Sequence, residues 1–240
     1  HHVTYLVVED HLPAGSPSIR SDLRQDISVV NWRQIQDDPT GFFHAFRFDV
    51  VNSHNVSLDF RLDNGGYDLD LPYIVSLHGG YETVADQMKT LGAYLHRNVS
   101  RWLYLDEKNL AVLESIGLEE IQSKQTFNAL PECNSPRRCR VALRCELDLP
   151  QDAFALVIAS RAIVEKGWEI AIDAVRKARG ESGRDIVIVL IGTGPEADRL
   201  APIIQAEPWV YHLGFIENPR HILHAFDLGV LPSTFAGESF

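Results

Sequence analysis

Residues 154–200 read FALVIASRAIVEKGWEIAIDAVRKARGESGRDIVIVLIGTGPEADRL, and they show the clearest strand and helix pattern in the chain. Two unbroken apolar runs, 154–160 and 185–192, are typical of strands that are buried on both faces. Between them, one face of a predicted helix is apolar and carries Trp168, Ala171, Ile172, Val175 and Ala178. A second helix is expected from Pro195, because proline suits a first helical turn. This alternation predicts a parallel βαβ unit.

The same rhythm extends along the rest of the chain. Further strands are predicted at 4–8, 27–32, 49–53, 73–77, 102–105, 210–215 and 227–232. A stretch rich in proline and asparagine, with a basic cluster and a short helix, interrupts the rhythm before Phe154. We therefore predict an α/β protein with two Rossmann-like domains, 1–133 and 134–240, in which helices flank parallel sheets. The second domain, with four predicted strands, is expected to be incomplete, and Pro202 is expected to bend or shorten its helix.

Composition limits the function classes. The 240 residues are 45% hydrophobic and 23% charged, with a net charge of −11. These values are ordinary for a soluble globular protein, and the acidic balance argues against a general nucleic-acid binder. The sequence contains no apolar run of membrane-span length, and the opening HHVTYLVVED lacks the basic start of a signal peptide. We expect a cytoplasmic protein, with His1-His2 as a candidate tag remnant.

The three cysteines, Cys133, Cys139 and Cys145, are spaced six residues apart. This spacing fits neither the close pairs of zinc sites nor an even-numbered disulfide framework. We interpret them as buried or idle thiols in a reducing compartment.

A candidate phosphate site follows the first strand of the opening stretch. Arg161 lies at the carboxyl end of that strand, and Lys166 and Gly167 begin the next helix. Ligands of open α/β sheets bind at this edge, where a helix N-terminus favours an anion. A guanidinium and an ammonium group added there would complete a cradle for a diphosphate. The alternative is that both are solvated loop charges.

Two further loops follow strands in the same half. Gly192 and Gly194 permit close approach of a ligand to the backbone, but a full G-x-G-x-x-G is absent, because Asp198 and Arg199 stand where a third glycine would be. A tight strand–helix turn is the alternative. The third loop, PSTFAGESF, presents Glu238 after an apolar strand.

These elements together resemble a known family. SRAIVEKGW resembles an S-R-x-x-x-E-K-G segment, LIGTGPEADRL a G-x-G-P-E-x-x-x-L turn, and VYHLGFI and ILHAFDLGVLPS the two strands that follow. This half is similar to the donor-binding domain of GT-B fold glycosyltransferases, in particular family 4 (group 1) of the retaining enzymes. The combination over 154–240 is specific, although each element alone is weak.

The N-terminal half resembles the same family more loosely. FDVVNSHN is similar to D-V-V-H-x-H with Asn52 for the first histidine, and LPYIVSLHGGYE is similar to P-x-V-x-T-x-H-G. The family's N-G-V-D reads NALP at 128–131, and its glycine-rich first loop is missing. We therefore expect the chain to be incomplete at both ends, with the second glutamate of the family's E-x7-E motif at position 246 of the longer protein.

The resemblance implies roles for individual residues. The catalytic residues would be His78 and Glu238, both placed against the transferred sugar, with His54 as a weaker candidate. A satisfied structural histidine is the alternative for either ring. The residues that bind the donor would be Arg161, Lys166, Gly192, Gly194 and Phe215. Tyr81 and Glu82 are candidates for acceptor contact, with a solvated loop charge as the favoured interpretation of Glu82.

The function implied is transfer of a sugar from a nucleotide-sugar donor to an acceptor hydroxyl with retention, and the resemblance implies no metal and no cofactor. The acceptor hydroxyl would approach from the same face, so a β-phosphate oxygen would accept its proton and no carboxylate nucleophile would be required. The sequence also shows no carboxylate pair of the glycosidase kind. The acceptor would be a glycan, a lipid-linked or a small molecule, so a peripheral membrane contact through the acceptor stays open. No nucleic-acid partner is expected.

Three alternatives remain. A sugar-nucleotide epimerase or an inverting transferase would share the fold. A Rossmann-type dehydrogenase is disfavoured, because no acidic residue stands about 20 positions beyond a full glycine motif. A non-catalytic nucleotide-binding module is the third.

Overall fold

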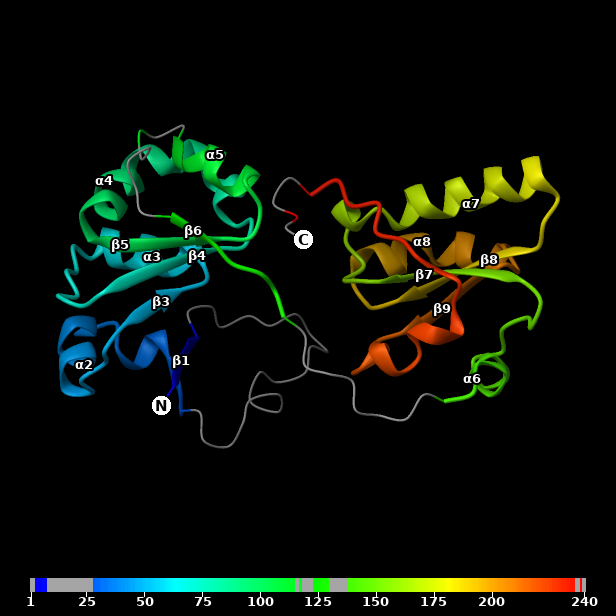
Figure 1. Cartoon of the computed structure of the whole chain (residues 1–240), viewed down its shortest axis with the longest axis horizontal. Coiled ribbons are helices and arrows are strands. Elements are labelled where there is room, and N and C mark those ends of the chain that lie inside the picture. The colour runs from blue at the N-terminus through cyan, green and yellow to red at the C-terminus, as the bar shows by residue number, and fades with distance from the viewer. Residues whose placement is uncertain are drawn as a thin grey trace. The chain divides into compact units, whose positions relative to one another are not determined.

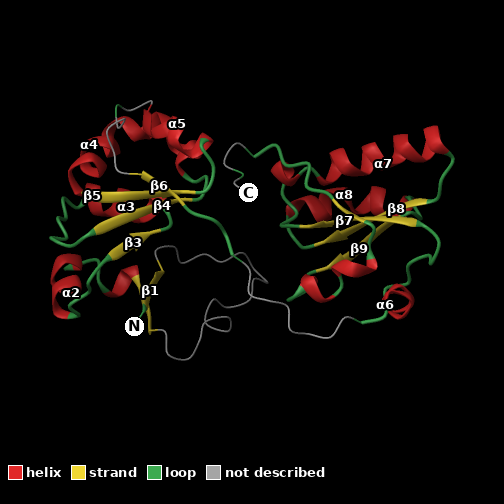
Figure 2. Ribbon diagram, viewed as in Figure 1, coloured by secondary structure: helices red, strands yellow, loops and turns green. Residues whose placement is uncertain are grey.

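The computed structural model describes residues 3–7, 28–114, 117, 123–129, 138–235 and 238. The described chain forms two compact units, one within residues 3–128 and the other within 129–235 (Figure 1). Each unit has its own cluster of buried apolar side chains. Both units combine parallel strands with helices, which confirms the predicted α/β class (Figure 2).

The first unit contains two parallel sheets. The smaller pairs β1 (Thr4–Val7) with β2 (Ser28–Asn31). The larger has the order β3-β4-β5-β6, with β3 at Val51–Ser53, β4 at Tyr73–Leu77, β5 at Val99–Tyr104 and β6 at Ser123–Gln125. Strand β6 was not predicted, because its three residues SKQ are polar and exposed and give no apolar run at this sheet edge.

Helices and 3-10 turns connect these strands. They are η1 (Trp32–Gln34), α2 (Pro39–Ala45), α3 (Val56–Asn64), η2 (Tyr81–Gln87), α4 (Met88–Asn98) and α5 (Lys108–Glu114). The start of α3 is fixed by its N-cap, where the Asn55 side chain accepts a hydrogen bond from the Ser57 amide at 2.9 Å. Helix α3 therefore begins directly after the loop that carries His54, one of the candidate site residues.

The described residues of the second unit form one parallel sheet with the order β10-β7-β8-β9. Its strands are β7 (Phe154–Ala159), β8 (Ile186–Ile191), β9 (Val210–Gly214) and β10 (Leu228–Gly229). All four lie within runs that the sequence predicts as strands. Every residue of β8 is buried, as expected for the continuous run IVIVLI between two neighbouring strands.

The helices of this unit follow the predicted pattern. They are α6 (Arg140–Glu146), η3 (Val164–Lys166), α7 (Trp168–Ser182), α8 (Pro195–Ala206), η4 (Pro219–His221) and η5 (Leu223–Ala225). Helix α7, the long yellow helix of Figure 1, buries Trp168, Ala171, Ile172 and Val175, which belong to the predicted apolar face. It packs against β8, and α8 packs against β9.

Of the two effects expected of Pro202, shortening of the helix is wrong, and bending stays a prediction. Helix α8 continues past Pro202 to Ala206. The side chain of Pro202 is exposed. The hydrogen bond that proline removes therefore falls on the solvent side, where water can satisfy the carbonyl left without a donor.

A buried arginine supports the last strand. Arg144 of α6 is 1% exposed and donates to four carbonyl oxygens, those of Pro150, Gln151, Ala153 and Ala225. It also pairs with Asp227 at 2.8 Å, and Asp227 accepts from the amide of Ala155 in β7. These bonds anchor the chain just before β10, and so fix where the following loop starts.

Candidate functional site

The loops that follow the strands of the second unit gather at the carboxyl edge of its sheet. Arg161 follows β7, the turn 192–194 follows β8, Phe215 follows β9, and the loop 230–235 follows β10. All four strands are parallel, so their carboxyl ends meet at one edge. Three of these loops carry the predicted donor-binding residues.

Two of these loops are joined directly. The carbonyl of Glu165, in the turn before α7, accepts hydrogen bonds from the hydroxyl of Ser233 at 3.0 Å and the amide of Thr234 at 2.8 Å. The ammonium nitrogen of Lys166 lies 5.9 Å from the ring centroid of Phe235. The structure therefore brings the predicted cation Lys166 beside the loop that leads toward Glu238.

The basic residues differ in their surroundings. Arg161 is exposed, and Lys166 is half-buried at the end of η3. Gly167, with φ at +68°, is the N-cap of α7, and no side chain caps this helix end. Helix α7 thus begins one residue after Lys166, as the sequence predicts. Positive charge and a helix N-terminus lie side by side, which is an arrangement that suits a bound anion.

The glycine turn after β8 is tightly packed. Gly192 has φ at +138°, and a Cβ atom there would lie 1.9 Å from the carbonyl oxygen of Ser160. At Gly194, the corresponding distance to the carbonyl oxygen of Ala162 is 2.4 Å. The strand–helix turn alone therefore explains both glycines. Whether they also approach a ligand stays a prediction.

Two side chains reinforce this edge. The indole nitrogen of Trp168 donates to the Ser160 hydroxyl at 3.0 Å, and Nε2 of His212 lies 2.9 Å from the Gly192 carbonyl oxygen. The two rings meet edge to face with centroids 5.6 Å apart. Neither residue was predicted to belong to the site. A histidine inside a predicted strand gives no signal for such a contact.

The remaining donor-side candidates are Phe215 and Glu238. Phe215 is 51% exposed at the end of β9, so its ring is available to stack on a ligand. Glu238 is half-buried and lies beyond the residue range of the second unit. The role predicted for each stays a prediction.

In the first unit, the two predicted histidines contact each other. Nδ1 of His54, after β3, lies 2.9 Å from Nε2 of His78, after β4, and the rings stack with centroids 5.1 Å apart. Both side chains are exposed, but partial burial of the rings lowers the pKa of each, and repulsion from His78 lowers the pKa of His54 further. One nitrogen of this contact must donate and the other must accept. The pair therefore acts as one unit, with Nε2 of His54 and Nδ1 of His78 left for other contacts.

Tyr81, a candidate acceptor contact, points into the core instead. Its side chain is 2% exposed, and its hydroxyl donates to the carboxylate of Asp59 in α3. The ring packs edge to face on Trp102, with centroids 6.1 Å apart. The expectation that Tyr81 contacts an acceptor is therefore wrong, because η2 turns this ring inward.

Glu82 is also not the solvated loop charge favoured from the sequence. Its side chain is half-buried, and Oε1 accepts from the amide of Asn109 at 2.8 Å. Oε2 is buried and accepts no hydrogen bond from any residue that the structure describes. Asn109 itself is 0% exposed and was not identified from the sequence.

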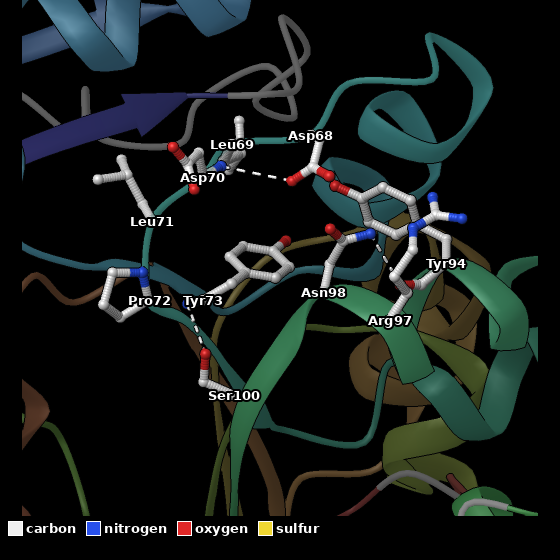
Figure 3. A pocket seen from close by; sticks show the side chains of 10 residues that line it. All are labelled: Asp68, Leu69, Asp70, Leu71, Pro72, Tyr73, Tyr94, Arg97, Asn98 and Ser100. Atoms are coloured by element: carbon white, nitrogen blue, oxygen red, sulfur yellow. Dashed lines mark hydrogen bonds between the residues drawn. The ribbon is translucent and has the colours of Figure 1, made fainter.

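Two cavities lie away from these loops. One, of about 390 Å³, is lined by side chains at the amino ends of β4 and β5: Asp68, Leu69, Asp70, Leu71, Pro72, Tyr73, Tyr94, Arg97, Asn98 and Ser100 (Figure 3). The other, of about 400 Å³, lies at the amino ends of β7 and β8 and includes Arg140, Arg184 and Asp227. Ligands of parallel α/β sheets bind at the opposite edge.

The described residues also bear on membrane spans, metal sites and free thiols. None of the helices described combines the length and apolar character needed to cross a membrane. In the same residues, no group of three or more His, Cys, Asp or Glu side chains is arranged to hold a metal ion. Cys139 and Cys145 are free thiols and exposed, so burial, the first of the two expectations, is wrong for these two, and idle thiols, the second, stays a prediction. Cys133 lies outside the described residues.

Part of the chain is similar in sequence to a known protein family. Residues 153–240 match the family described as glycosyl transferases group 1. No curated protein matches the sequence. The family match covers the candidate donor loops, which include Arg161, Lys166 and the Gly192 turn.

Comparison with solved structures addresses the fold. HepE from Anabaena, in complex with UDP and glucose, superposes with a TM-score of 0.72 at 15% identity, over 97% of this chain and 74% of that one. Sucrose-phosphate synthase from Thermosynechococcus elongatus gives 0.68 at 12%, over 100% and 67%. A glycosyltransferase from Rickettsia africae gives 0.68 at 12%, over 96% and 73%. The fold is the predicted GT-B fold.

Proposed function

We propose that this chain, in which residues 153–240 match the group 1 glycosyl transferases, transfers a sugar from a nucleotide-sugar donor to an acceptor hydroxyl with retention of configuration and without a metal ion. One observation carries the proposal: the turn ending at Lys166 and the loop 233–235 are hydrogen bonded together at the carboxyl edge of the matched sheet. This is the edge where α/β sheets bind their ligands.

The donor's diphosphate would be held by charge and by helix geometry. The Arg161 guanidinium and the Lys166 ammonium supply two positive groups, and the N-terminus of α7 adds its dipole. Fixed positive charge at the leaving group stabilises the negative charge that develops as the nucleotide departs. This supply of charge supports a reaction without a metal.

The transferred sugar would be contacted by Glu238 and His78. Glu238 would accept hydrogen bonds from sugar hydroxyls, and His78, oriented by His54, would contact the same sugar. The bond between the anomeric carbon and the β-phosphate oxygen breaks, and a bond from the acceptor oxygen forms on the same face of the ring. The acceptor's proton passes to the β-phosphate oxygen, so no carboxylate nucleophile takes part.

The acceptor would be a glycan, a lipid-linked or a small molecule, bound at the first unit in the cytoplasm. Glu82 supports this assignment, because its buried Oε2 has no partner among the described residues and can accept a hydrogen bond from a hydroxyl. HepE binds UDP-glucose in its solved complex, so UDP-glucose is the first donor to test.

Thermal unfolding with nucleotides tests donor binding. UDP or GDP at 100 times its Kd should stabilise the chain by about 2.7 kcal/mol through mass action, and NAD should leave Tm unchanged. Lys166→Ala should abolish the nucleotide shift. Lys177→Ala is the matched control, because Lys177 is exposed on the outer face of α7 and pairs only loosely with Glu181 at 3.8 Å. A shift with NAD alone would overturn the proposal.

An assay of sugar transfer tests the other two parts of the proposal, which are metal independence and retention of configuration. With donor and acceptor, product formation should be unchanged by EDTA, and NMR of the product should show the donor's anomeric configuration. Activity that EDTA abolishes and Mg²⁺ or Mn²⁺ restores would contradict metal independence. An inverted product would contradict retention and leave the donor site in place.

A further inference from the structure

The first unit contains a buried carboxylate that the proposed mechanism does not use. Asp59 of α3 is 0% exposed, and each of its two carboxylate oxygens accepts a hydrogen bond from a tyrosine. The Tyr73 hydroxyl donates to Oδ1 and the Tyr81 hydroxyl donates to Oδ2. Both tyrosines are themselves buried, at 1% and 2% exposure. A charged group in such a place is expensive unless it is fully hydrogen bonded.

The surroundings of Asp59 partly offset this cost. Burial raises the pKa of Asp59 to about 6, and hydrogen bonds from Tyr73, Tyr81 and Ser53 act in the opposite direction. An apolar residue in this position would avoid the cost altogether. Because a buried carboxylate is destabilising without its donors, Asp59 needs the groups that donate to it to stay in place.

The partners of Asp59 lie next to the paired histidines. Ser53, the last residue of β3, directly precedes His54. Tyr81 begins η2 and is separated from His78 only by Gly79 and Gly80. One buried carboxylate thus contacts the two chain segments whose adjoining loops carry the histidine pair.

We infer that Asp59 is a positioning residue, which fixes the segments around Ser53 and Tyr81 and so sets the contact between His54 and His78. Its effect on the sugar-transfer step rests on the proposed function. Its effect on the histidine pair does not, because that pair is a feature of the first unit alone.

The two tyrosines differ in what else holds them. Tyr73 lies inside β4, and its backbone is paired with Val51 on one side and Val99 on the other. Tyr81 lies beyond the end of β4, after two glycines, where no strand pairing fixes the backbone. Loss of the hydroxyl should therefore release the segment at Tyr81 and not at Tyr73.

Tyr81→Phe and Tyr73→Phe form a matched pair, because each removes one hydroxyl from the same buried carboxylate and keeps the ring. The primary measurement is the ring ¹⁵N NMR spectrum of His54 and His78 above their pKa. Tyr81→Phe should change the tautomer populations or the shifts of both rings, and Tyr73→Phe should leave them as in the wild type. Urea unfolding should show a similar loss of stability in both variants.

Kinetics provide the second measurement. Tyr81→Phe should lower kcat about 10- to 100-fold, because a misplaced group costs rate, and should keep the wild-type rise of Tm with UDP. Tyr73→Phe should keep the wild-type kcat and the wild-type rise of Tm with UDP. If the wild type transfers no sugar but the NMR difference appears, the proposed function fails and the positioning role stands.

The inference would be overturned if the His54 and His78 spectra of both variants match the wild type, or if both variants change these spectra to the same extent. Should Tyr81→Phe fail to fold, Ser53→Ala tests the other segment, since the Ser53 side chain lowers the pKa of Asp59 while its hydroxyl donates to the Asn55 carbonyl oxygen at 3.2 Å. Ser53→Ala should change the His54 resonances, and wild-type resonances in that variant would overturn the inference as well.

Discussion

The two units hold their carboxyl-edge loops by different means. In the first unit, the loops that carry His54 and His78 are tied by side chains, through the ring contact and the tyrosine hydroxyls on Asp59. In the second unit, the loops after β7 and β8 are tied mainly by the backbone. The amide of Ala162 donates to the Thr193 carbonyl at 2.9 Å, and the amide of Glu196 donates to the Ala162 carbonyl at 2.9 Å.

This difference has physical consequences. Side-chain contacts that involve Asp and His titrate, so the first unit should respond to pH. Backbone contacts do not titrate, but they leave no room for a Cβ atom, so the second unit should respond to substitution of its glycines. The first loop system is therefore held by groups that titrate, and the second by backbone that has no room for a side chain.

The largest expected effect is that of Gly192→Ala. The new Cβ would lie 1.9 Å from the Ser160 carbonyl oxygen at a φ of +138°. Because the obstructing oxygen belongs to the backbone directly after β7, the clash can be relieved only if this edge of the sheet moves. We expect a loss of about 4 kcal/mol or more in the free energy of unfolding, together with loss of the nucleotide shift. Urea unfolding measures the first and thermal unfolding with UDP the second.

Gly180→Ala is the control for this prediction. Gly180 lies in helix α7 with open space around its Cβ position. Alanine there should raise stability by about 0.5–1 kcal/mol, since it is the better helix former. Equal behaviour of the two variants would show that the turn after β8 does not depend on a glycine.

The next effect is the pH dependence that Asp59 gives to the first unit. The pKa of Asp59 is raised from 3.8 to about 6, mainly by burial. The folded state therefore binds this proton more tightly, and the resulting stabilisation is present below pH 4 and lost as the pH rises through 6. Asparagine does not titrate, so the Asp59→Asn variant does not lose stability in this way as the pH rises. Its stability relative to the wild type should rise by up to about 3 kcal/mol from pH 4 to pH 7.

Urea unfolding of the wild type and of Asp59→Asn across this pH range checks the prediction. The contributions of the other carboxyl groups are common to both proteins and cancel when the two free energies of unfolding are subtracted. Glu146→Gln is a control of opposite sign, because Arg138 lowers the pKa of the exposed Glu146. A difference between Asp59→Asn and the wild type that stays constant with pH would contradict the burial of a titrating Asp59.

The sequence predicts much more of the second unit than of the first. The strand and helix runs of 154–233 and the start of α7 after Lys166 follow from local patterns, because the loops there are defined by backbone geometry and neighbouring residues. The contact between the Glu165 carbonyl and Ser233 is tertiary, and no local pattern indicates it.

The features that sequence patterns miss in the first unit depend on contacts between distant segments. Asp59 lies on the buried side of α3 with Val56 and Leu62, three residues before and after it, and a carboxylate at an otherwise apolar position is the only sequence signal of its buried role. Tyr81 and Glu82 follow two glycines, a context that suggests an exposed loop, but η2 turns the first inward and pairs the second with Asn109. Orientation in such a turn is set by packing, which local sequence does not encode.

A smaller effect is expected within the histidine pair. Burial lowers the pKa of His54, and repulsion from His78 lowers it further. His78→Gln removes the repulsion and keeps a hydrogen-bonding side chain, so the pKa of His54 should rise toward its ordinary value. NMR titration of the His54 ring measures this, and His96→Gln, on exposed helix surface, is the control. An unchanged His54 titration in His78→Gln would show that the two rings are not coupled.

The smallest effect is expected at His212, the one described histidine that contacts the glycine turn of the second unit. Its Nε2 lies 2.9 Å from the Gly192 carbonyl oxygen, but the side chain is exposed, so water can replace the bond. The turn is already held by the Gly192 amide, which donates to the Gly214 carbonyl at 2.8 Å. His212→Ala should therefore cost only about 0.5–1 kcal/mol and should keep the UDP shift. A loss as large as that of Gly192→Ala would mean that a side chain, and not the backbone, holds this turn, and the contrast between the two units would disappear.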